Sequence, residues 1–89
     1  MNSHASHPEI VTRLKRASGH LTKVIAMIEA GEGCENVAQQ LQAVTNALAS
    51  AKRQYVTEHI ENCLDVQEEM TPREVAAQIK SLKAMTKYL

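Results

Sequence analysis

The chain has 89 residues, enough for one small domain whose single core would be only marginally stable. It has no Trp or Phe and only two Tyr, and its remaining apolar residues are mostly aliphatic, which favours helices and argues against a β-sandwich or barrel. Ten basic and ten acidic residues cancel, so the net charge by itself gives no support for a nucleic-acid partner. We therefore predict an all-α protein, one domain over residues 1–89, that gains stability by associating with copies of itself.

The N-terminal segment predicts a tail followed by a helix. Residues 1–7 lack an apolar stretch, so we expect a flexible tail without a secretory signal, no membrane-spanning segment, and a cytoplasmic protein. Ser6, Pro8 and Glu9 then form a helix-start pattern with a potential capping box. Apolar residues recur at steps of four and three along this first helix: Ile10, Leu14, Ala17, Leu21, Val24 and Ile28. Gly31 and Gly33 end it.

The second and third helices follow from the same spacing. No Gly or Pro interrupts the chain from Cys34 to Met70, and this long helix has its own apolar stripe: Val37, Leu41, Val44, Leu48, Ala51 and Tyr55. A helix of this length needs the first helix on one side and a second subunit on the other. Thr71, Pro72 and Glu74 start a short third helix, whose apolar face is Val75, Ile79, Leu82 and Leu89.

Two cysteines and a histidine on the second helix are candidate metal ligands. In a reducing cytoplasm, Cys with His nearby indicates a metal or reactive site more than a disulfide. His59 and Cys63 are four residues apart, so they lie on one face of the helix. Cys34 is twenty-nine residues before Cys63, about 43 Å along a straight helix, so it cannot join them within one chain. An antiparallel pair of second helices crossing near Leu48 would bring Cys34 of one chain to His59 and Cys63 of the other, giving two equivalent sites.

The charged residues are distributed unevenly along the chain. Arg13, Lys15, Arg16 and Lys23 lie in the first third and Lys52-Arg53 in the middle, followed by an acidic segment from Glu58 to Glu69. This distribution is compatible with a basic face, but on charge alone an ordinary solvated helix surface is the favoured interpretation. No Gly-rich loop or pair of acids accompanies Cys34, so we predict that the protein is not an enzyme and has no small-molecule substrate.

These residues together resemble the CsoR/RcnR family of metal-responsive repressors. The resemblance rests on the run from Arg13 to Leu21, on Cys34, on the run from Gln39 to Val44, and on His59 and Cys63, and it covers nearly the whole chain. It implies a three-helix protomer with a long second helix, an antiparallel dimer, and a dimer-of-dimers tetramer. It also implies a repressor that binds operator DNA when metal-free and releases it on binding metal, usually to express a metal-efflux gene. The metal ligands by matching position are Cys34, His59 and Cys63, and the residues facing DNA are Arg13, Lys15, Arg16, Lys52 and Arg53.

The effector is predicted from residues around these ligands. Two thiolates and one imidazole suit Cu(I), but copper-type members carry a Tyr before the first Cys and a Glu on the third helix, where this chain has Gly33 and, by offset, Ile79. Nickel- and cobalt-responsive members add an N-terminal His, for which His4 and His7 are candidates. The terminal Lys87-Tyr88-Leu89 is also similar to the nickel/cobalt branch called DmeR or NreA. We favour Ni(II) or Co(II), with Cu(I) as the alternative, and a metal buffer or chaperone that does not bind DNA as a further alternative.

Overall fold

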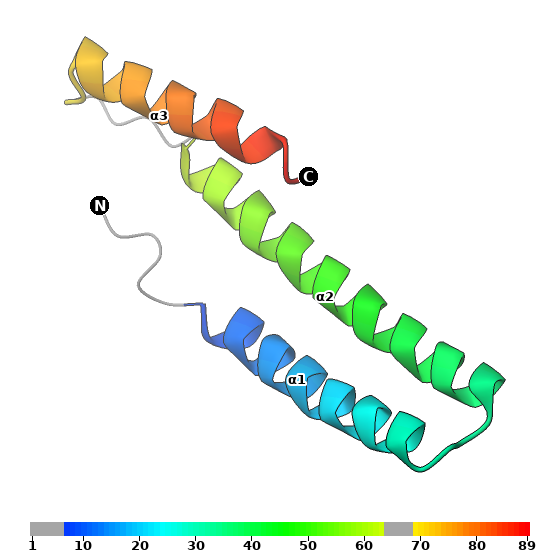
Figure 1. The fold of residues 1–89 in the computed structure, drawn as a ribbon. Helices are drawn as coiled ribbons and strands as arrows, with labels where there is room; N and C mark the ends of the chain where they lie inside the picture. The colour runs from blue at the N-terminus through cyan, green and yellow to red at the C-terminus, as the bar shows by residue number, and fades with distance from the viewer. Residues whose placement is uncertain (1–6, 64–68) are drawn as a thin grey trace. The chain divides into compact units, whose positions relative to one another are not determined.

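The computed structural model describes residues 7–63 and 69–89, and these form three helices with no strand among them. The helices are α1 (Pro8–Glu29), α2 (Cys34–Cys63) and α3 (Pro72–Thr86), as Figure 1 shows. The all-helical, three-helix prediction is thus confirmed. The described residues fall into two compact units, one of residues 7–52 and one of residues 53–89, and each is treated separately below. None of the described helices is long and apolar enough to cross a membrane.

The first unit is a hairpin of α1 and the first part of α2 (Figure 1). The predicted glycine turn joins them as a Schellman motif: the amide of Gly31 donates to the carbonyl of Ile28 at 3.0 Å, and the amide of Glu32 to that of Met27 at 3.1 Å. Gly31 has φ of 74°, in the left-handed region that glycine adopts without strain. At the other end α1 begins at Pro8 as predicted. Its N-cap is His7, which makes no side-chain capping bond, so the predicted capping box with Ser6 as N-cap and Glu9 as its partner is wrong; Ser6 itself lies outside the described residues.

The core of this hairpin contains about half of each predicted stripe. Ile10, Ala17 and Val24, seven residues apart in turn, are buried together with Met27 on α1, and Val44 and Ala51 are buried on α2. Val37 is half-buried. Five other members of the stripes face outward, with exposed fractions of 39–57%: Leu14, Leu21, Ile28, Leu41 and Leu48. Alternate apolar residues therefore pack within the hairpin while the intervening ones remain exposed. The sequence spacing identifies the stripes but not which residues the hairpin buries.

The second unit contains the last part of α2 and the whole of α3. The predicted capping box starts α3: the Thr71 hydroxyl accepts from the Glu74 amide at 3.1 Å, and the Glu74 carboxylate accepts from the Thr71 amide at 2.9 Å. Hydrogen bonds from the backbone and side chain of Thr71 lower the pKa of Glu74. The predicted apolar face is only partly correct, because Val75 and Leu82 are half-buried whereas Ile79 and Leu89 are 48% and 64% exposed.

Candidate metal centre and DNA-binding surface

The three predicted metal ligands lie at the two ends of α2. Cys34 is the first residue of the helix, and its thiol is free and exposed. Cys63 is the last residue; its side chain lies outside what the structure describes. His59 is half-buried one turn before Cys63. The helix is continuous between Cys34 and Cys63, as the argument for an inter-subunit site requires.

His59 has a hydrogen-bond partner on α3 that was not predicted from the sequence. Its Nε2 lies 3.0 Å from the hydroxyl oxygen of Ser81 on α3, a hydrogen bond between residues twenty-two apart in sequence. By offset, Ile79 stands where copper-type members carry the Glu of the third helix, and its side chain is 48% exposed. A histidine that binds metal through one ring nitrogen usually donates the other N–H to a partner that fixes the ring. Ser81 is placed to be that partner for His59.

The described residues of one chain do not complete a metal site. Among them, no three His, Cys, Asp or Glu side chains gather closely enough to hold an ion. His7 is half-buried at the start of α1, and His4 lies outside the described residues, so their predicted role as ligands stays a prediction. Two thiols and an imidazole are the donors that Cu(I), Ni(II), Co(II) and Zn(II) accept, so the chemistry of the set fits a transition metal. Because these donors lie at opposite ends of α2, their placement fits a metal ion that is bound by two chains together.

The predicted DNA-binding residues are all exposed. Arg13 forms an ion pair with Glu9, one turn away on α1, at 3.4 Å, with both side chains about half or more in solvent. Such an exposed pair stabilises a helix by only a few tenths of a kcal/mol and leaves the guanidinium available to other anions. Lys15, Arg16, Lys52 and Arg53 form no ion pair with any described carboxylate.

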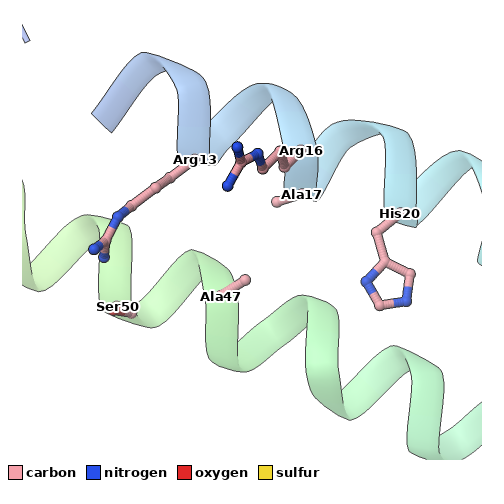
Figure 2. A pocket seen from close by; sticks show the side chains of 6 residues that line it. All are labelled: Arg13, Arg16, Ala17, His20, Ala47 and Ser50. Atoms are coloured by element: carbon pink, nitrogen blue, oxygen red, sulfur yellow. The ribbon is translucent and has the colours of Figure 1, made fainter. Parts of the chain in front are cut away.

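Two of these arginines share a hollow between α1 and α2, which Figure 2 shows from close by. Its lining residues are Arg13, Arg16, Ala17, His20, Ala47 and Ser50. The four from α1 are spaced by three, one and three residues, so they lie on one helix face. Lys15 is about 200° around the helix axis from Arg13 and is directed away from this face. Of the three α1 residues predicted to face DNA, Arg13 and Arg16 therefore line the pocket, whereas Lys15 does not.

His20 also lines this pocket, although it was not among the site residues predicted from the sequence. Its Nε2 lies 2.7 Å from the side-chain oxygen of Gln40 on α2, a bond between residues twenty apart. The i, i+4 and i, i+7 spacing of His20 from Arg16 and Arg13 was the available signal. It could not be interpreted before the position of α2 was known.

Comparison with known proteins identifies the family of the chain. Residues 6–88 match the model of the family described as metal-sensitive transcriptional repressors. The chain belongs to this family. Its members are repressors and not enzymes, and the CsoR/RcnR resemblance is confirmed at the family level. The nickel/cobalt branch stays a prediction.

Three relatives of this repressor chain illustrate the match. It is 42% identical over 53 residues to the copper-sensing transcriptional repressor CsoR of Mycobacterium ulcerans, covering 60% of this chain and 45% of that protein. It is 36% identical over 52 residues to the copper-sensing repressor RicR of Mycobacterium tuberculosis, covering 58% and 54%. The aligned part of the chain thus spans about half the length of each. A solved variant of the formaldehyde-responsive regulator FrmR from Salmonella enterica serovar Typhimurium has a TM-score of 0.74 at 30% identity, covering 93% of this chain and 98% of that one.

Proposed function

We propose that the chain is a transition-metal-responsive repressor that binds operator DNA when metal-free and releases it when Cys34, His59 and Cys63 bind metal. The observation that carries the proposal is the placement of soft donors at both ends of one helix, in a member of a metal-sensitive repressor family. Release of DNA would allow expression of a metal-efflux gene. The proposed site of action is the cytoplasm, where thiols stay reduced and able to bind metal.

The metal site is proposed to form between two antiparallel α2 helices. The exposed apolar residues Leu41, Leu48 and Tyr55 recur every seven residues on α2, and each is 39–43% exposed in the protomer. In a twofold pair centred on Leu48, Leu41 of one chain lies opposite Tyr55 of the other, so an apolar seam is covered. The same register places Cys34 opposite residue 62, between His59 and Cys63. One pairing thus accounts for both the exposed seam and the separated ligands. Two such dimers would form the proposed tetramer.

Mixing two inactive variants tests the inter-subunit site. A Cys34→Ala chain paired with a His59→Ala chain keeps one site with all three ligands, whereas neither homodimer keeps any. We expect heterodimers to bind one metal per dimer with near-parent affinity, measured by anaerobic titration after isolating the heterodimer with two different tags. No high-affinity binding in verified heterodimers would place the site within one chain.

The DNA-binding surface is proposed to include the exposed basic residues of α1 and the Lys52-Arg53 pair. Contacts of Lys and Arg with phosphates supply much of a repressor's affinity and make it salt-dependent. An Arg16→Gln, Arg53→Gln double variant should lower the slope of log affinity against log salt by about 2 for each chain that contacts the DNA, since each phosphate contact contributes roughly one. Arg73→Gln on α3 is the matched control, since it removes the same charge from another exposed position.

This double variant also separates the repressor from a metal buffer or chaperone. In a repressor, the operator affinity falls while the affinity for metal stays that of the parent protein. A parent protein that binds metal tightly but shows no preference for its own upstream DNA over random duplex would support the buffer instead.

Two effectors have specific support. Cu(I) is favoured by the copper-sensing relatives, by the two-thiolate, one-imidazole donor set, and by Ser81, which supplies His59 with the ring partner missing at position 79. Ni(II) or Co(II), the effector favoured by the sequence, is supported by His4 and His7, which would extend the donor set to four or five.

Anaerobic titration of the reduced protein with each metal distinguishes them. The readouts are thiolate charge-transfer absorption and release of fluorescent operator DNA. Release by Ni(II) or Co(II) that is lost in a His4→Ala, His7→Ala variant assigns those metals. Release by Cu(I) alone, unchanged in that variant, assigns copper.

A further inference from the structure

The pocket between α1 and α2 has the shape and charge of a small anion site. It is an open hollow of about 400 Å³ within the 7–52 unit, with Ala17, Ala47 and Ser50 as small residues along its base. Because these side chains are short, the long ones of Arg13 and Arg16 extend over the hollow, as Figure 2 shows. The guanidinium of Arg13 reaches across toward Ser50, and that of Arg16 lies between it and His20.

The charge of the pocket selects the class of ligand. Two guanidinium groups contribute to its lining and no carboxylate does, so a cation is disfavoured there. Arg13 is paired with the carboxylate of Glu9 at 3.4 Å in an exposed ion pair that an anion can replace at little cost. Arg16 has no such partner among the described residues. Guanidinium groups bind phosphate oxygens in a bidentate manner, so a phosphate group fits this pair.

His20 adds a directional donor. Its Nε2 lies 2.7 Å from the Gln40 side-chain oxygen, and because that oxygen accepts, Nε2 carries the hydrogen. The hydrogen bond holds the ring, and its other nitrogen is turned toward the side of the pocket where Arg16 and Ala47 lie (Figure 2). In the imidazolium form both nitrogens donate, one to Gln40 and one into the pocket. Gln40 is therefore a positioning residue for His20.

We propose that this pocket binds one phosphate-type oxyanion, with Arg13 and Arg16 supplying charge and the imidazolium form of the Gln40-anchored His20 supplying a directed hydrogen bond. Two ligands carry such an oxyanion: a phosphodiester of the DNA backbone and free phosphate. The inference rests on the proposed DNA binding for its preferred source, the backbone. It assigns a defined subsite to what would otherwise be a diffuse basic surface, and it adds His20 to the set of binding residues.

The test uses the full-length, metal-free protein and inorganic phosphate, against chloride at equal ionic strength and fixed pH. We expect phosphate, and not chloride, to shift the NMR signals of the Arg13 and Arg16 side chains and of the His20 ring in a saturable way. Arg16→Gln and His20→Phe should each weaken phosphate binding about tenfold or more. Arg73→Gln, which removes a charge outside the pocket, should not. Circular dichroism confirms that each variant is folded.

Competition with DNA distinguishes the two sources. If the pocket binds the DNA backbone, phosphate displaces duplex DNA more strongly than chloride at equal ionic strength, and His20→Phe abolishes this difference. If the pocket binds free phosphate, the signals shift equally in the DNA-bound protein and no displacement occurs. Both results support an oxyanion site.

Two results would overturn the inference without affecting the proposed function. One is the absence of a saturable phosphate shift in a protein that still binds its operator. The other is a His20→Phe variant with the phosphate affinity of the parent, which would remove His20 from the site. Failure of the parent protein to bind operator DNA would refute the proposed function instead, while phosphate binding would still test the pocket.

Discussion

The hydrogen bond between His59 and Ser81 predicts how strongly α3 affects metal affinity. Replacing Ser81 by Ala removes the hydroxyl 3.0 Å from the ring Nε2 and leaves the ring without this constraint. Loss of such a partner typically lowers metal affinity 10- to 100-fold, or about 1.4–2.7 kcal/mol. Because His59 and Ser81 are only half-buried, water can partly replace the hydroxyl, and we expect the lower end, about tenfold. The assay is competition for metal with a chelator of known affinity, under anaerobic conditions.

Two further variants separate the loss of this bond from a general loss of structure. Ser81→Thr keeps a hydroxyl and should retain most of the affinity, whereas Ser18→Ala makes the same chemical change at an exposed position of α1 and should have no effect. In the metal-free protein, Ser81→Ala should lower the free energy of unfolding by about 0.5–1.5 kcal/mol, the contribution of one neutral hydrogen bond. A folded Ser81→Ala protein that binds metal within twofold of the parent would refute the role of Ser81.

Three further predictions concern stability, each followed by thermal unfolding with circular dichroism. Val44 is 2% exposed, so Val44→Ala should lower the free energy of unfolding by about 2 kcal/mol at every protein concentration. If Leu48 covers a dimer seam, the melting temperature of Leu48→Ala should depend on protein concentration more steeply than that of the parent protein. Equal concentration dependence in the two proteins would argue against that seam. Folding lowers the pKa of Glu74, so this residue stabilises the protein at pH values above its ordinary pKa, and the contribution is lost as the pH falls through the lowered pKa. The parent protein should therefore be more stable than Glu74→Gln near neutral pH but not in acid. A difference in stability that does not change with pH would contradict this prediction. Gly19 lies in a helix with nothing within 4 Å of an added methyl group, so Gly19→Ala should raise the free energy of unfolding by about 0.5–1 kcal/mol. Gly31 has φ of 74°, so Gly31→Ala should lower the free energy of unfolding by about 1 kcal/mol. Shifts of the same sign in the two variants would contradict this reasoning.

The exposed seam on α2 links the fold to the proposed function. Leu41, Leu48 and Tyr55 are exposed apolar residues that recur every seven residues on α2, and covering them with a second chain would stabilise the protein. The proposed metal site uses a pair of α2 helices with the same crossing point. In this proposed dimer a single register would serve stability and metal binding together, and a substitution at Leu48 is expected to affect both.

The local features of this fold could be predicted because each depends on residues close in sequence. The capping box pairs Thr71 with Glu74, and the glycine turn depends on Gly31 and bonds spanning three and five residues. Their hydrogen bonds form whatever the rest of the chain does, so short motifs are sufficient to identify them. Helical spacing likewise identified the apolar stripes and the shared face of His59 and Cys63.

The pairs that give the candidate sites their chemistry could not be found in this way. His20 meets Gln40 across twenty residues, and His59 meets Ser81 across twenty-two. Counting by offset placed Ile79 at the partner's position and so indicated that His59 lacks a partner, because an offset transfers a position along the chain and not the rotation of one helix against another. Burial failed for the same reason: Leu14 and Ala17 both belong to the α1 stripe, but the way α1 packs on α2 covers only Ala17.

By itself the sequence determined three helices, the glycine turn after α1, the capping box of α3, the donor residues at the two ends of α2, and the family, because these depend on local hydrogen bonding, periodicity and residue type. Only the tertiary structure decided which half of each stripe is buried, that Ser81 holds the His59 ring, and that Arg13, Arg16 and His20 share one pocket. Those features depend on the rotation and translation of helices against one another. Side-chain packing sets both, and helical periodicity leaves several packings open.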